Sequence, residues 1–255
     1  MCLIALAYQH HDDYPLIVIA NRDEYHYRPT ATLHPWPQPS PIIAGRDLTA
    51  GGTWLGISKT GRFAAVTNFR AGAPEQNNEL LSRGQLCANA LSSSEPVTQH
   101  LSNIEQQARQ YAGFNLLLGD SKQLYYLANH GPERQRLSPG VHALSNGELN
   151  NQWPKVTDTQ LALEQALSTK KPEVEQLFEL LMDKNRAADW QLPNTGIDLE
   201  KERLLSSRFI ISEDYGTRSS AVILFHRSGG INFFEQHYDS KGATHKRSTI
   251  TINAP

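Results

Sequence analysis

Two pairs of amphipathic helices divide this chain into three groups of short strands, and that order limits the possible folds more than any other feature. The helical periodicity covers residues 79–91 and 95–111, and then about 155–168 and 172–184. Strands are predicted at 2–9, 15–20, 53–58, 62–68, 114–119, 123–128 and 141–145, and near 209–212, 219–226, 231–238 and 246–252. Two sheets, each covered by one helical pair, bury all of these apolar faces. We therefore expect one α+β domain over residues 1–255, a four-layer αββα sandwich of two mainly antiparallel sheets.

Two long stretches are predicted to lack regular structure. Residues 25–50 contain Pro29, Pro35, Pro37, Pro39 and Pro41, and proline excludes most helical and strand positions. Residues 186–203 show neither helical nor strand periodicity. Between these stretches, Ser94 is the expected N-cap of the second helix, because serine side chains accept hydrogen bonds from the first helical turn.

The composition excludes several classes of partner. The net charge is −2 and no basic run occurs, so neither nucleic acid nor an anionic membrane surface is an expected partner. No stretch approaches the roughly 20 apolar residues of a membrane-spanning helix. The two cysteines have no disulfide-framework or zinc spacing, which favours a reducing compartment, and we expect the cytoplasm. The ten histidines form no metal or haem motif, so no metal or cofactor is predicted.

Cys2 is the first candidate for chemistry. Removal of Met1, which a small second residue permits, would place a thiol and an α-amine on one residue. The amine, with an ordinary pKa of about 7.7–8.0, can act as a general base for a thiol of pKa about 8.5. The alternative is a small apolar residue at the start of a buried strand, where cysteine is common.

The run Asn21-Arg22-Asp23-Glu24 lies where the second strand is expected to end. A hairpin of the first two strands would bring this run back beside Cys2. A guanidinium there would favour thiolate over thiol, and a carboxylate would hold the α-amine. The alternative is a solvated polar turn.

Several motifs together carry a family resemblance. ANRDE at 20–24, Tyr27-Arg28-Pro29 and AGGTWLGISKTGRFAAVTNFR at 50–70 are followed in order by SRG at 82–84, ALSNG at 143–147 and GTRSS at 216–220. The chain thereby resembles the NRDE family, also called the transport and Golgi organisation family, over nearly its whole length. That family is similar to the N-terminal-nucleophile (Ntn) cysteine hydrolases, which include bile-salt hydrolases and penicillin V acylases. The resemblance implies the αββα fold and cleavage of non-peptide amide bonds.

The resemblance also implies roles for individual residues. Cys2 matches the nucleophile, Arg22 the arginine after the second strand, and Arg218 the late arginine near the nucleophile. Asn68 and Asn146 match the two asparagines of the site, and fixed donors of this kind stabilise the oxyanion. Asn also commonly ends strands without any such role. The carboxylate that contacts the α-amine lies three residues after the arginine in those hydrolases; Tyr25 occupies that position here, so Asp23 is chosen from the neighbouring acids.

Three further residues are candidates for contact with the substrate. Trp54, Tyr25 and Arg28 are predicted to bind substrate, although a core position for Trp54 is an equal alternative. Gly51 and Gly52 are expected to provide unusual backbone angles or close approach.

The resemblance implies an amide or acyl hydrolase working through a thioester. The competing hypotheses are a non-catalytic carrier of haem or of an acyl or lipid metabolite, since family members are linked to both, and a structural protein. No oligomeric state follows from the sequence.

Overall fold

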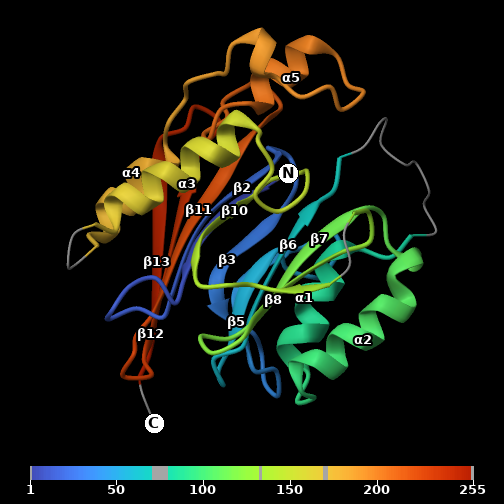
Figure 1. Cartoon of the computed structure of the whole chain (residues 1–255), viewed down its shortest axis with the longest axis vertical. Helices are drawn as coiled ribbons and strands as arrows, with labels where there is room; N and C mark the ends of the chain where they lie inside the picture. The colour runs from blue at the N-terminus through green and yellow to red at the C-terminus, as the bar shows by residue number, and fades with distance from the viewer. Residues whose placement is uncertain (1, 71–79, 132–133, 169–171, 254–255) are drawn as a thin grey trace. The chain divides into compact units, whose positions relative to one another are not determined.

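The computed structural model describes residues 2–70, 80–131, 134–168 and 172–253, and the chain forms two compact units (Figure 1). The described residues of the first unit are 2–27, 70, 139–168 and 172–253, and those of the second are 28–69, 80–131 and 134–138. Each unit contains one sheet in which all strand pairs are antiparallel. No helix among the described residues is long and apolar enough to cross a membrane.

The sheet of the first unit has six strands in the order β10-β1-β2-β11-β12-β13. Their bounds are β1 Cys2–Tyr8, β2 Leu16–Tyr25, β10 Gly140–Leu144, β11 Tyr215–Phe225, β12 Ile231–Tyr238 and β13 Thr244–Ile252. The predicted hairpin of the first two strands is present, with Cys2 opposite Arg22 and Tyr8 opposite Leu16.

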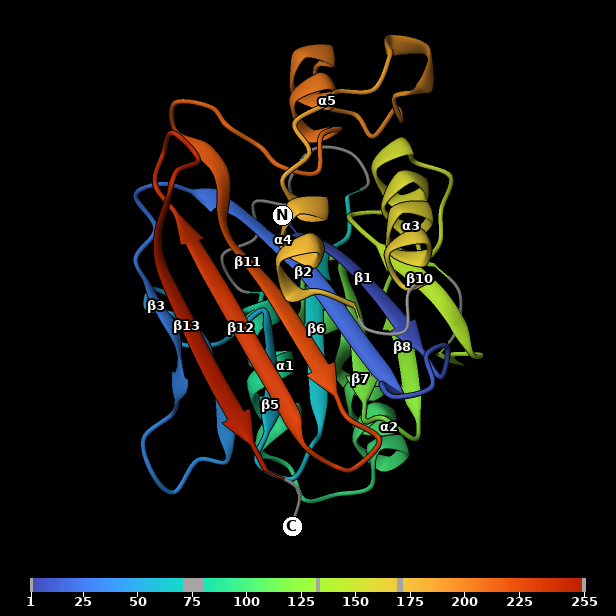
Figure 2. The same ribbon diagram turned by 90° about the vertical axis from the view of Figure 1, so that its left-hand side faces the viewer.

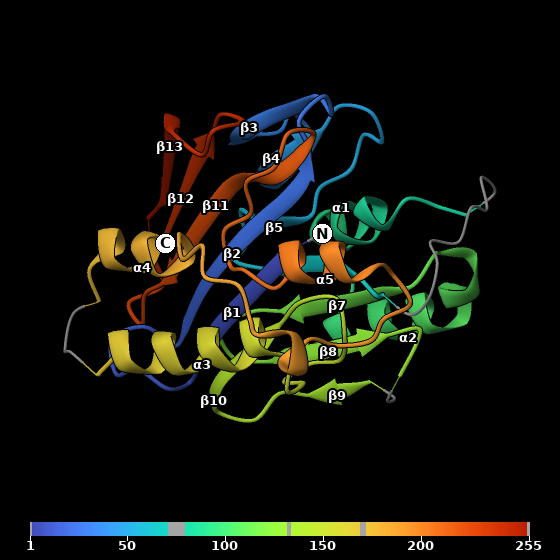
Figure 3. The same ribbon diagram turned by 90° about the horizontal axis from the view of Figure 1, so that it is seen from above.

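Two helices cover one face of this sheet, α3 (Pro154–Ala166) and α4 (Val174–Leu181). Figure 2 shows both helices against the strands, and α3 lies over β1 and β10 while α4 lies over β2 and β11 (Figure 3). Ala5, Ile17 and Ile19 share a buried cluster with Val156 and Phe178. Because side chains alternate along a strand, the odd-numbered residues of β1 and β2 face these helices.

The sheet of the second unit has seven strands in the order β3-β4-β5-β6-β7-β8-β9. Their bounds are β3 Thr30–Pro35, β4 Ile42–Asp47, β5 Leu55–Ser58, β6 Phe63–Asn68, β7 Phe114–Gly119, β8 Leu124–Ala128 and β9 Gln135–Arg136. Helices α1 (Arg83–Ser92) and α2 (Val97–Gln107) share a buried cluster with its strands, in which Leu91, Leu101 and Leu116 are nearly inaccessible. A 3-10 turn, η1 (Ala108–Gln110), follows α2.

The segment between β4 and β5 uses its two glycines as expected. Gly51 has a φ of 75°, in the left-handed region that favours glycine. Gly52 packs against the main chain of Gly84, and a Cβ atom on Gly52 would lie 2.4 Å from the Gly84 carbonyl carbon. Thr53 N also donates to Gly84 O at 3.2 Å. The AGG and SRG motifs therefore contact each other through their main chains, at Gly52 and Gly84.

The prediction that residues 25–50 lack regular structure is wrong, because β3 and β4 lie there. Pro35 is the last residue of β3, which is an edge strand, and the next three prolines fall in the connection to β4. An edge strand tolerates proline, since its outward N–H groups need no partner in the sheet.

Four other predictions need correction. Residues 186–203 contain η2 (Asp189–Gln191) and the start of α5 (Leu199–Leu205), which Asp198 caps by accepting from Lys201 N. Ser94 does not cap α2, whose N-cap is Pro96. Residues 209–212 form only an isolated bridge from Ile211 to Gly216. β2 continues to Tyr25, so the NRDE run lies inside a strand.

Candidate functional site

Cys2 opens β1 directly opposite Arg22 of β2. Residues opposite each other in an antiparallel pair project to the same face, with Cβ atoms about 5 Å apart. Arg22 is 5% exposed, pairs across its other side with Ser219, and places Nη2 3.7 Å from Glu24 Oε2. The hairpin thus brings a buried guanidinium beside the thiol.

Asp23 follows Arg22 and therefore points to the opposite face of β2, which the helices cover. Its side chain is 1% exposed, and Oδ1 accepts a hydrogen bond from Thr217 Oγ1 at 2.7 Å. Thr217 Oγ1 in turn accepts from Ile210 N at 2.9 Å. Asn21, on the same face, donates to the carbonyl oxygens of Leu181 and Arg208. The polar run of β2 is consequently held by fixed partners on both faces.

Asn146 is connected to Cys2 by the hydroxyl group of the preceding residue, Ser145. Ser145 follows β10, the other neighbour of β1, and its Oγ lies 3.2 Å from Cys2 O and 3.3 Å from Asn146 Oδ1. Asn146 is 3% exposed, and its carbonyl oxygen accepts from Arg70 N at 2.7 Å. The first unit therefore gathers Cys2, Arg22 and Asn146 at one end of β1.

Arg218 lies in a β-bulge of β11, where the register with β2 shifts between Thr217 and Ser219. Its Nη1 donates to the carbonyl oxygens of Tyr25 and His26, each at 2.8 Å. Burial lowers the pKa of Arg218, and the charge of Arg22 acts in the same direction. Arg218 thereby ties the end of β2 to β11.

Tyr25 ends β2 with 46% of its surface exposed. Its ring stacks on Tyr27 at a centroid distance of 5.3 Å and meets the edge of Tyr215 at 5.3 Å. Burial raises the pKa of Tyr215 well above its ordinary value, and the charges of Asp23 and Cys2 add to this shift. An aromatic surface therefore lies at the same end of the sheet as Arg22.

The remaining three candidates belong to the second unit. Asn68 ends β6, opposite Phe114 of β7. Trp54 is half-buried, and its ring packs so closely on Gly45 that a Cβ there would lie 2.6 Å from the ring. Arg28 Nε forms an ion pair with Asp47 Oδ2 at 2.6 Å.

Opposing influences act on the pKa of the Cys2 thiol, and their net effect is to raise it. Burial raises its pKa above the ordinary value, and the charge of Asp23 adds to this effect. The positive charges of the chain's N-terminus and of Arg22 act in the opposite direction. The resting thiol is therefore protonated near neutral pH and needs a base before it can attack.

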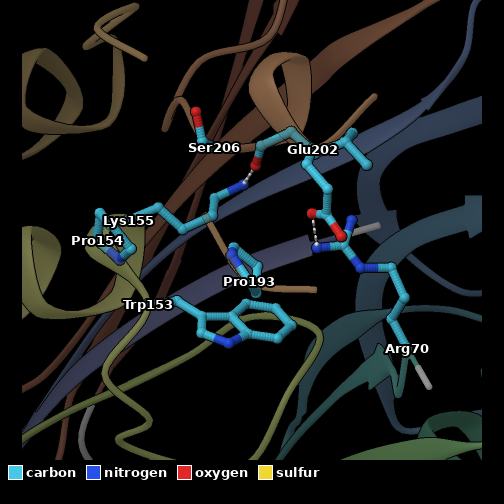
Figure 4. Close-up of a pocket in the computed structure, with 8 residues that line it drawn as sticks. Arg70, Trp153, Pro154, Lys155, Pro193, Glu202 and Ser206 are labelled. Atoms are coloured by element: carbon cyan, nitrogen blue, oxygen red, sulfur yellow. Dashed lines mark hydrogen bonds and ion pairs between the residues drawn. The ribbon is translucent and has the colours of Figure 1, made fainter. Parts of the chain in front are cut away.

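A small cavity of the first unit was not anticipated from the sequence. Arg70, Trp153, Pro154, Lys155, Pro193, Glu202, Leu205 and Ser206 line it (Figure 4). Lys155 Nζ donates to Leu205 O at 2.9 Å, and Arg70 Nη2 lies 3.0 Å from Glu202 Oε2. Lys155 is only 6% exposed, and nothing in the helical pattern of residues 155–168 marks this lysine as buried.

Comparison with known proteins gives consistent matches over most of the chain. A family model described as Transport and Golgi organisation 2 matches residues 1–240. A bovine Transport and Golgi organization protein 2 homolog is 33% identical over 241 residues, covering 88% of this chain and 86% of the relative. The human homolog is 30% identical over 249 residues, covering 91% and 90%.

Solved structures show the same fold at very low sequence identity. A mutant conjugated bile acid hydrolase from Clostridium perfringens matches with a TM-score of 0.56 and 9% identity, covering 98% of this chain and 92% of that one. An N-acylethanolamine-hydrolyzing acid amidase ortholog from Caenorhabditis elegans matches with a TM-score of 0.50 and 8% identity, covering 88% and 92%. These likenesses confirm the predicted α+β class, with two antiparallel sheets and their helices, and are consistent with the sandwich of the Ntn hydrolases.

Proposed function

This chain belongs to the Transport and Golgi organisation 2 family, and from that premise we propose that it is an N-terminal cysteine hydrolase. The proposed reaction cleaves a non-peptide amide, or a related acyl bond, of a small molecule in the cytoplasm. The observation that carries the proposal is the position of Cys2, at the start of β1 and directly opposite the buried Arg22, in a chain with the fold of Ntn hydrolases. A thiol used only for packing needs no guanidinium beside it.

The proposed chemistry begins when removal of Met1 makes Cys2 the N-terminal residue. The α-amine takes the thiol proton, and the sulfur attacks the carbonyl carbon of the substrate. The tetrahedral intermediate collapses as the C–N bond breaks, and the amine passes its proton to the leaving nitrogen. Water then hydrolyses the thioester, which releases the acid and restores the thiol. Arg22 stabilises the thiolate at the moment of attack.

Asn146 and Asn68 are the proposed donors to the oxyanion, where a single fixed donor contributes about 3 kcal/mol. The Ser145 hydroxyl and the main chain of Arg70 fix Asn146, which supports the first of these roles. Asp23 is proposed to orient the α-amine. An amine at the start of a strand belongs to the backbone and lies between the two faces of the sheet, so a carboxylate on either face can approach it.

The substrate contacts remain predictions. Tyr25 is the strongest of the three, because it is exposed at the same end of the sheet as Arg22 and Arg218. Arg28 already holds Asp47 in an ion pair, and Trp54 packs on Gly45, so both have structural roles within the second unit.

A labelling experiment tests the nucleophile directly. Intact-mass measurement of the natively expressed protein should show loss of Met1, and a cysteine-directed acylating probe should add one acyl group. The Cys2→Ala variant should lose this labelling, whereas Cys87→Ala, a fully buried cysteine of α1, should keep it. Retention of Met1, or labelling that survives in Cys2→Ala, would rule out the mechanism.

Turnover is measured separately, over a panel of acyl amides and thioesters. We expect the wild type to hydrolyse at least one amide and Cys2→Ala to lose more than about 99% of that rate, since removal of a nucleophile typically costs several orders of magnitude. Saturable binding of haem or of an acyl metabolite, seen as a spectral shift without any turnover, would replace the proposal with the carrier hypothesis.

A further inference from the structure

Lys155 is a buried ammonium on the helix-covered side of the six-stranded sheet. It stands in the first turn of α3, which lies over β1 and β10, and it is 6% exposed. Its Nζ donates to Leu205 O at 2.9 Å. The cavity beside it (Figure 4) has a volume of about 10 Å³, which is room for about one water molecule. A group of a substrate does not fit there, so the charge of Lys155 acts on the protein's own groups.

One segment of the chain connects Lys155 with the surroundings of Asp23. Residues 205–210 begin at the carbonyl oxygen that accepts from Lys155 Nζ, and they end at a main-chain N–H that donates to Thr217 Oγ1. Thr217 Oγ1 in turn donates to Asp23 Oδ1 at 2.7 Å. Burial lowers the pKa of Lys155, and the negative charge of Asp23 opposes that shift. Lys155 and Asp23 are therefore opposite charges within electrostatic range on one side of the sheet.

A carboxylate that orients the α-amine of Cys2 also stabilises the protonated form of that amine. A protonated amine has no lone pair, so it cannot take the proton of the thiol. A second cation near the same carboxylate offsets this effect, because the two cations repel each other and share one negative charge. Lys155 has this relation to Asp23, and the charge of Cys2 acts on Lys155 as well.

The other titratable groups near the start of β1 come from β2, β11, α5 and the chain after β6. They are Arg22, Glu24, Tyr215, Arg218, Glu202 and Arg70. Arg22 Nη2 lies 3.7 Å from Glu24 Oε2, and Arg70 Nη2 lies 3.0 Å from Glu202 Oε2, so these charges are paired. Arg218 donates to carbonyl oxygens at the end of β2. Burial raises the pKa of Tyr215 well above its ordinary value, so its phenol is uncharged.

We propose that Lys155 is a positioning residue whose positive charge, acting on Asp23 from the side of α3, keeps the α-amine of Cys2 in its neutral, proton-accepting form. This inference rests on the proposed hydrolase function and deepens it, since it names the group that sets the protonation state of the base. Without the charge of Lys155, the amine would bind a proton at a higher pH and the thiol would lose its base near neutrality.

Competitive acetylation of the α-amine tests this role without any turnover. The protein is the full chain with Cys2→Ala, which keeps the amine and lacks the thiol, released from a cleavable leader so that residue 2 is N-terminal. Trace acetic anhydride reacts with the neutral amine, and mass spectrometry of the N-terminal peptide gives the rate at each pH. Adding Lys155→Met should lower the rate at pH 6 about tenfold and leave the rate at pH 10 within about twofold, because a nearby cation no longer opposes protonation. Equal rates at pH 6 would overturn the inference.

Three further variants separate charge from packing. Lys201→Met, at an exposed lysine of α5, is the matched control and should react like the parent protein. Lys155→Arg keeps the positive charge and should keep the rate at pH 6 within about twofold. A loss in Lys155→Arg as large as that in Lys155→Met would show a packing role and count against the proposal. If Lys155→Met does not fold, Lys155→Gln, which keeps a donor for Leu205 O, replaces it with the same expected loss.

In the chain that retains Cys2, the same substitution should move only the acid side of the pH profile of kcat/KM. We expect Lys155→Met to lower kcat/KM about tenfold at pH 6 and less than about twofold at pH 9, with recovery in Lys155→Arg. An equal loss at both pH values would show a structural role instead. Absence of turnover in the wild type contradicts the hydrolase proposal alone, whereas an unchanged acetylation rate contradicts the role of Lys155 alone.

Discussion

Neighbouring side chains of β2 have different surroundings because a strand alternates its residues between two faces. Arg22 shares its face with Cys2, while Asn21 and Asp23 point toward the face covered by α3 and α4. All three are at most 5% exposed. Polar residues can occupy such positions when they have specific partners, as Thr217 is for Oδ1 of Asp23.

Thr217 offers a test of this arrangement at the scale of one hydroxyl group. Thr217→Val keeps the shape of the side chain, but it removes the donor to Asp23 and the acceptor of Ile210 N. We expect the free energy of unfolding in urea to fall by about 2–4 kcal/mol, because two buried polar groups lose a partner.

The control is Thr249→Val, the same exchange at an exposed position of β13, which should change stability by less than about 0.5 kcal/mol. If the two variants were equally stable, the hydrogen bonds of Thr217 would contribute little to holding Asp23.

At the scale of elements, backbone contacts explain motifs that side chains do not. The AGG segment before β5 and the SRG segment before α1 meet at Gly52 and Gly84, and Gly52 has no room for a side chain. β3 likewise depends on its place in the sheet, since Pro35 is acceptable only because the strand lies at an edge. The identity of these residues follows from where each element lies.

The two adjacent glycines separate steric overlap from backbone strain. Gly52→Ala would place Cβ 2.4 Å from the Gly84 carbonyl carbon, and we expect thermal and urea unfolding to show a loss of about 3 kcal/mol. Gly51→Ala has open space around its Cβ and a φ of 75°, so it should cost only about 1 kcal/mol. Equal losses would mean that the Gly52–Gly84 contact can relax.

At the scale of the whole molecule, buried titratable groups connect stability to pH. His100 of α2 has 12% of its side chain exposed, and burial lowers its pKa below the ordinary 6.5. Its hydrogen bond to Glu95 opposes this shift. Between the folded and the unfolded pKa, the unfolded chain binds more protons, so stability rises with pH in that window.

Removing the imidazole should flatten this part of the pH profile. We expect wild-type stability, measured by urea unfolding, to fall as the pH drops from 7 through 6.5 toward the lowered pKa of His100. His100→Gln should lose less stability over the same interval, because no proton is taken up at that position on unfolding. An unchanged profile in the variant would show that His100 does not control this pH dependence.

Local patterns determined a large part of this protein directly from sequence. The hairpin of β1 and β2, the two helical pairs, the second hairpin at β5 and β6, and the position of Cys2 follow from periodicity and turn residues within short windows. The glycines at 51 and 52 could also be interpreted, because glycine marks positions that other residues cannot occupy.

Only the tertiary structure decided which polar residues become buried partners. Asp23 and Thr217 are 194 positions apart, and Lys155 meets Leu205 50 positions away, so no local window contains either pair. The same holds for the strands among the prolines, which depend on their neighbours in the sheet. Burial and pairing depend on contacts between distant segments, and these contacts pair Asp23 with Thr217 and enclose Lys155 in the cavity.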